Sequence, residues 1–131
     1  VLEQAGDLRL RAYGHDLEEL FSNAVFGLGF IMMQERAFMR RVGEMEKIEL
    51  KAPDAESLLV GFLNEILARS QTRRRVYNRV KFLRFSEKAL EAQIFAVSAP
   101  SFRKDIKAVS YRNIEVKKKR NIFEAEVAVG A

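Results

Sequence analysis

Several residue types on which protein chemistry often depends are absent from this 131-residue chain, or nearly so. It contains no cysteine, which excludes disulfides, thiolate nucleophiles and thiolate metal sites and fits a reducing compartment. The single histidine, His15, argues against a histidine-dependent triad, and its place before a helix start is typical of a solvent-exposed turn residue. Neither of the glycine-rich phosphate motifs, GxxxxGK and GxGxxG, occurs. Conventional catalytic apparatus is therefore scarce.

Long apolar runs are also missing, because none approaches the roughly 20 residues that a membrane span needs. Glu3 and Asp7 interrupt the N-terminal segment, which is unlike a secretory signal peptide. We therefore expect a cytoplasmic protein with no membrane partner. The length is that of one domain, residues 1–131, with a single core.

Basic residues outnumber acidic ones, 23 against 18, which gives a net charge of +5 and favours acidic partners such as nucleic acid. Between positions 69 and 84 there is no acid, and such a run can be a solvated face or a surface that follows a phosphate backbone. Tyr77 within it could stack on a base. The basic residues of this run are Arg69, Arg73, Arg74, Arg75, Arg79, Lys81 and Arg84.

Local patterns predict the first elements. Residues 7–13 alternate between apolar and polar side chains, which indicates a strand with one buried face, and Gly14 tolerates positive φ where the chain must reverse. Asp16 and Glu19 form a capping pair that starts a helix. Gly27 and Gly29 weaken that helix unless packing compensates or the backbone approaches a neighbouring strand closely.

The remaining patterns complete an order β-α-β-α-β-β-β-β. This order predicts an α+β fold with two helices packed on a mixed, mostly antiparallel sheet, either both on one side or one on each half. The second helix should begin at Asp54 and end near Ser70, and its apolar residues form a wide stripe. The further strands are expected at 44–51, 76–85, 90–97, 106–117 and 123–129.

Several segments together resemble the archease family, in the family's order and across nearly the whole chain. The family's motifs are E-H-T-A-D, then A-Y-G and L-E-E-L-F, then L-L-V-x-W-L-N-E-L-L, and finally V-K-A-V-T-Y-H with L-x-V. The matching residues here are EQAGD at 3–7, AYG at 12–14, LEELF at 17–21, LLVGFLNEIL at 58–67, IKAVSY at 106–111 and IEV at 114–116.

The resemblance implies an accessory protein that is not itself a catalyst. Archeases assist the GTP-dependent tRNA-splicing ligase, whose guanylylation and repeated turnover they promote, so the implied partners are that ligase and RNA. The alternative is a basic RNA-binding or protein-interaction module without a metal site; a metal-dependent enzyme would need a general base and a completed site. The candidate partner-binding or RNA-binding residues are Arg73, Arg74, Arg75, Arg79, Lys81 and Lys107.

The resemblance also implies a divalent-cation site, calcium or magnesium, built from three carboxylates. Asp7 matches the first of them, whereas Gln34 and Gly130 stand where the family carries the other two. From its position alone, Asp7 could be a hard-cation ligand at the end of the sheet or a surface residue that ends the pairing. Because a hard cation needs several oxygen ligands, the inherited site is incomplete. Glu35 and the terminal carboxylate are the remaining candidate donors.

Overall fold

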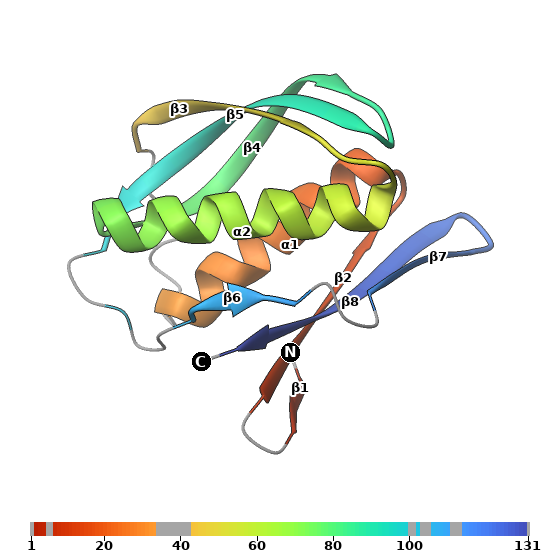
Figure 1. Ribbon diagram of the computed structural model, residues 1–131, viewed down its shortest axis with the longest axis horizontal. Coiled ribbons are helices and arrows are strands. Elements are labelled where there is room, and N and C mark those ends of the chain that lie inside the picture. The colour runs from red at the N-terminus through yellow and green to blue at the C-terminus, as the bar shows by residue number, and fades with distance from the viewer. Residues whose placement is uncertain are drawn as a thin grey trace.

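The computed structural model (Figure 1) describes residues 2–4, 7–33, 43–99, 102, 106–110 and 114–130, with the backbone alone for 2–4 and 7. Two long helices and eight strands make up this part of the chain. In order they are β1 (Leu2–Gln4), β2 (Asp7–Gly14), α1 (Leu17–Met33), β3 (Met45–Lys51), α2 (Ala55–Arg73), β4 (Arg75–Phe85), β5 (Ala89–Ser98), β6 (Ala108–Val109), β7 (Glu115–Lys119) and β8 (Ile122–Gly130).

The strands form two sheets. The larger has the order β1-β2-β8-β6, with β7 also paired to β8, and the smaller has the order β3-β5-β4. Every pairing among the described strands is antiparallel. The α+β prediction with two helices is therefore confirmed. The strand expected at 106–117 is in fact two, β6 and β7, which pair with different stretches of β8.

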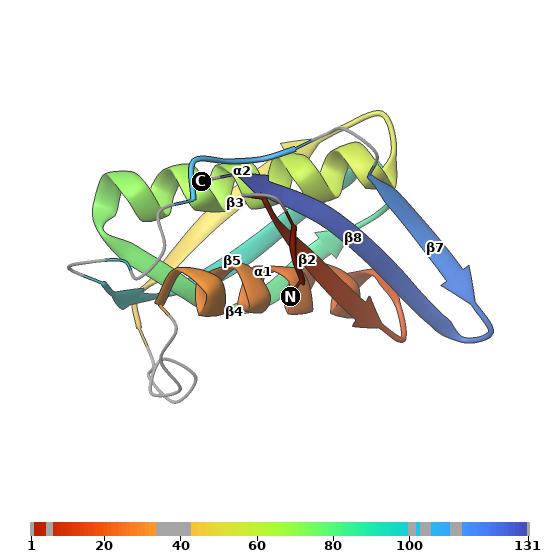
Figure 2. The ribbon, with the colours of Figure 1, turned by 90° about the horizontal axis from the view of Figure 1, so that it is seen from below.

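Both helices lie between the two sheets (Figures 1 and 2). Helix α1 contacts β2 on one side and β4 on the other, while α2 contacts β3 and β4 as well as β6 and β7. This arrangement explains Gly27 in α1, because a Cβ there would lie 2.6 Å from Cδ1 of the buried Leu10 in β2. The predicted close approach of helix and strand is thus confirmed. Within the described residues, no helix is long and apolar enough to cross a membrane.

An aromatic cluster joins the helices to the smaller sheet. The ring centroids of Phe21 in α1 and Phe85 in β4 are 5.0 Å apart with an edge-on geometry, and Phe62 in α2 lies 6.2 Å from Phe21. Phe82 of β4 completes the group, 5.9 Å from Phe62. Burial of such rings dominates core energetics, so this cluster fixes the smaller sheet against the helix layer.

Two local expectations need correction. Gly14 does not have a positive φ; glycine is needed there because a Cβ would lie 2.3 Å from the backbone nitrogen of Leu20. Helix α2 continues past Ser70 to Arg73, and it ends where Arg74 adopts the left-handed conformation (φ 55°, ψ 58°) and donates its N–H to the Ser70 carbonyl. That closing hydrogen bond stabilises the additional turn. The N-caps occur where predicted, since Asp16 and Asp54 accept from the amides of residues 19 and 57.

Candidate functional site

One end of the larger sheet gathers three segments singled out from the sequence (Figure 1). Leu8 is opposite Val129, so the preceding residue, Asp7, starts β2 beside the last residue of β8, Gly130. On the other side of β8, the Lys107 amide donates to the Gly130 carbonyl at 2.8 Å. The fold thus brings the backbone of Asp7, Gly130 and Lys107 to one place.

Helix α2 fixes the short strand at this site. The Asn64 side chain donates to the Val109 carbonyl (2.9 Å) and accepts from the Val109 amide (2.8 Å), and the Gln71 amide group donates to the Ile106 carbonyl. Ile106 is fully buried, whereas Lys107 is exposed. The backbone at Lys107 is therefore held from two sides, by α2 and by β8, while its side chain is exposed to solvent.

Sequence reasoning did not single out Asn64 as a functional residue. A signal was present, because Asn64 is a polar residue next to Leu63 in the apolar stripe of α2, and a partly buried amide needs partners. Those partners are on a strand 45 residues away in the chain, so spacing along the helix could not identify them.

Within the described residues, too few donor groups lie at this end of the sheet to hold a hard cation. Gly130 has no side chain, and its carbonyl already accepts the Lys107 amide. The side chain of Asp7, all of Gln34 and Glu35, and the terminal carboxylate of Ala131 lie outside the described residues. In the part of the chain that is described, no three His, Asp or Glu residues form a group able to hold a metal. Calcium and magnesium prefer several oxygen ligands.

The basic run divides into two parts, and the first converges on one acid. Glu46, on the inward side of β3, accepts from Arg69 (3.3 Å), Arg75 (2.9 Å) and Arg73. The Tyr77 hydroxyl donates to the same carboxylate at 2.8 Å. Because Tyr77 is only 1% exposed, the expectation that it stacks on a base is wrong.

Electrostatics follow from this geometry. Burial acts to raise the pKa of Glu46, but the hydrogen bond from Tyr77 and the charges of Arg73 and Arg75 outweigh it, so that the pKa is lowered. Burial and the bond to Glu46 raise the pKa of Tyr77. Glu46 is thus ionised at neutral pH, and it offsets part of the positive charge of its arginines. Arg74 points elsewhere, with its guanidinium 5.9 Å from the Phe102 ring centre.

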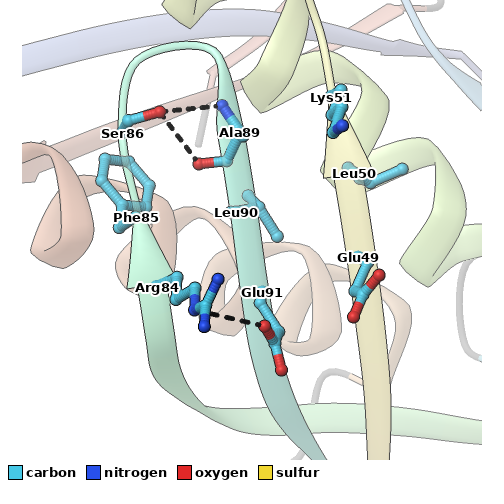
Figure 3. A pocket seen from close by; sticks show the side chains of 9 residues that line it. All are labelled: Glu49, Leu50, Lys51, Arg84, Phe85, Ser86, Ala89, Leu90 and Glu91. Atoms are coloured by element: carbon cyan, nitrogen blue, oxygen red, sulfur yellow. Dashed lines mark hydrogen bonds and ion pairs between the residues drawn. The ribbon is translucent and has the colours of Figure 1, made fainter.

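The second part of the basic run lies on β4 and is solvent-exposed. Arg79 and Lys81 are exposed, and the Arg79 guanidinium is 5.4 Å from the centre of the Phe95 ring. Arg84 lies 3.9 Å from Glu91 across the β4–β5 pair. Figure 3 shows Arg84 and Glu91 at an open pocket of about 580 Å³ near the β4–β5 hairpin. This pocket mixes both charge signs.

His15 is an exposed turn residue, as predicted. Its Nδ1 lies 3.0 Å from the Glu19 carboxylate, and its side chain is 79% exposed. Glu19 also accepts from the His15 amide at 3.2 Å, so the pair belongs to the start of α1.

Comparison with known proteins agrees with this fold and these motifs. Residues 1–129 match the model of the Archease protein family. The protein archease of Methanosarcina mazei is 30% identical over 98% of this chain and 92% of its own length, and that of Thermoplasma acidophilum is 29% identical over 89% and 83%. The solution structure of Methanobacterium thermoautotrophicum protein 1598 has a TM-score of 0.74 at 25% identity, covering 99% of this chain and 96% of its own. The crystal structure of a Thermotoga maritima archease, titled a possible chaperone, has a similar fold, with a TM-score of 0.63 at 16% identity, covering 100% of this chain and 95% of its own. From its sequence and its fold together, this chain belongs to the archease family.

Proposed function

We propose that this chain is a cytoplasmic accessory protein, not itself an enzyme, that assists a GTP-dependent tRNA-splicing RNA ligase by promoting its guanylylation and multiple turnover. The observation that carries the proposal is the family match over residues 1–129. It is supported by the sparse catalytic apparatus, since the only histidine is an exposed residue that pairs with Glu19.

The partner surface that we propose is centred on Lys107. Its backbone is fixed by β8 through Gly130 and by α2 through the neighbouring contacts of Ile106 and Val109. A backbone that is already fixed loses little freedom on binding, and such preorganisation favours affinity.

The test uses the ligase from the same organism with a tRNA exon substrate. Added wild-type protein should increase ligase guanylylation and the number of products formed per ligase. Lys107→Ala should weaken this stimulation, whereas Lys119→Ala, at an exposed position on the β7 hairpin, should not. Absence of stimulation by the wild-type protein, with or without calcium or magnesium, would exclude the role.

A second candidate function is RNA binding by the basic residues that do not contact the Glu46 carboxylate. It is favoured by the exposure of Arg79, Lys81 and Lys107. Arg73 and Arg75 are weaker candidates, because their guanidinium groups already contact a carboxylate.

A further inference from the structure

The outer face of the smaller sheet is turned away from the helix layer. The inward residues of β5, such as Ala92 and Ile94, are buried, and the side chains between them point outward. The register places these outward residues in rows across the three strands β3, β5 and β4. The rows are Met45, Phe95 and Arg79; then Lys47, Gln93 and Lys81; then Glu49, Glu91 and Arg84.

An aromatic ring lies in the central strand of this face. Phe95 is partly exposed. Phe82 and Phe85 of the adjacent strand β4 pack against the hydrophobic core, whereas Phe95 does not. The Arg79 guanidinium is 5.4 Å from the Phe95 ring centre, and Met45, on its other side, is 45% exposed. Aromatic rings and guanidinium planes are both surfaces on which unstacked bases stack.

Cations flank the ring. Lys47 and Lys81 are exposed on the two outer strands, one row from Phe95. That places them about 10 Å apart across the sheet and about 7 Å along it from the ring row. In the described part of the chain, neither lysine has a carboxylate within ion-pair distance. The only acids in these rows, Glu49 and Glu91, lie together in the third row, where Arg84 is 3.9 Å from Glu91.

We propose that this outer face, centred on Phe95, Arg79, Lys47 and Lys81, binds single-stranded RNA. One base stacks on the Arg79–Phe95 pair, and the flanking phosphates contact the two lysines. A duplex does not fit this mode, because its bases are already stacked. The choice of RNA over DNA rests on the proposed function at an RNA ligase. This face is distinct from the Lys107 site, which lies on the larger sheet.

The test is fluorescence anisotropy with the purified chain and a short labelled oligouridylate. Two phosphate contacts predict that binding weakens about sevenfold between about 50 and about 200 mM salt. Lys47→Glu/Lys81→Glu should abolish binding at low salt. Phe95→Leu, which keeps an apolar side chain, should weaken binding at least fivefold, because base stacking on an aromatic ring contributes roughly 1–3 kcal/mol. Circular dichroism melting verifies that each variant is folded.

The matched control is Lys117→Glu/Lys119→Glu, which changes the net charge equally on the β7 hairpin of the other sheet. Equal loss in the control and the test variant would overturn the assignment to this face. So would equally tight binding of duplex RNA, or tighter binding of single-stranded DNA. If the wild type binds no RNA but Lys47→Glu/Lys81→Glu loses ligase stimulation, the face binds the ligase and the RNA proposal is wrong. If RNA binds as described and the ligase is not stimulated, only the proposed function fails.

Discussion

The Tyr77 hydroxyl donates a 2.8 Å hydrogen bond to Glu46, at the centre of a group that also holds Arg73 and Arg75. The group joins the inward face of β3 to the end of α2 and the start of β4. In the sequence this run of arginines resembles unpaired positive charge. In the structure, Arg73 and Arg75 of the run contact Glu46 and join β3 to α2 and β4.

Replacing the Glu46 carboxylate should weaken these contacts and lower the stability of the fold. We expect Glu46→Gln to lower the free energy of unfolding by about 2–3 kcal/mol, because hydrogen bonds to a charged group are lost and the arginines keep partly buried charge. Urea denaturation measures the change. The control is Glu44→Gln, whose side chain is 82% exposed beside Arg75 and which should change stability by less than about 0.5 kcal/mol. Equal effects of the two variants on the free energy of unfolding would contradict the stabilising role of Glu46.

The same carboxylate predicts how stability depends on pH. The pKa of Glu46 is lower in the folded chain than its ordinary value, so its stabilising effect is complete above the unfolded pKa, about 4.3. That effect is lost as the pH falls through the lower, folded pKa. The difference in unfolding free energy between wild type and Glu46→Gln should therefore shrink below about pH 4. Urea denaturation from neutral to acidic pH gives this difference, and a constant difference would contradict the assignment.

Asn64 should position the strand that carries Lys107. Asn64→Asp keeps the acceptor for the Val109 amide but sets a carboxylate oxygen against the Val109 carbonyl. We expect a loss of about 2 kcal/mol and faster hydrogen exchange of the Val109 amide. Protonation restores a donor, so the loss should diminish in acid. The control is Asn121→Asp, in the exposed turn after β7, and unchanged exchange at Val109 would contradict the positioning role.

Gly130 offers a test of the missing cation ligand. A Cβ at this position would meet nothing closer than the Ala108 carbonyl oxygen at 3.9 Å, so a side chain fits. In the backbone register of the β2–β8 pair, Asp7 occupies the position opposite Gly130. Gly130→Asp should therefore gain a calcium-dependent rise in melting temperature that the wild type lacks. Gly130→Ala controls for the side chain alone, and an equal calcium effect in both would contradict the prediction.

Much of the fold follows from local patterns. The alternation in residues 7–13 correctly predicted a strand with one buried face, since Leu8, Leu10 and Ala12 of β2 are buried. The capping residues Asp16 and Asp54 correctly predicted both helix starts. The division into two sheets did not follow, because alternation gives each strand a buried face without specifying which strands pair.

The candidate site was less predictable, because a local pattern does not specify which residues from distant parts of the chain will be in contact. The pattern of β3 placed Glu46 beside Ile48 on the inward side, which could have indicated a buried acid in need of partners. Its partners Arg73 and Arg75 lie at the end of α2 and the start of β4, and only the folded chain brings them to Glu46. Phe95 and Lys47 were overlooked because the rows across β3, β5 and β4 depend on register.

The two hydrogen bonds between Asn64 and Val109 have a consequence for self-association. Val109 pairs with Val129 on one side, and on the other side its amide and carbonyl are occupied by the Asn64 side chain. An unpaired strand edge can recruit a strand from another molecule. Here the Asn64 side chain of α2 already bonds to the Val109 amide and carbonyl that such a strand would use. The segment that carries Lys107 is therefore protected from edge-to-edge aggregation at Val109.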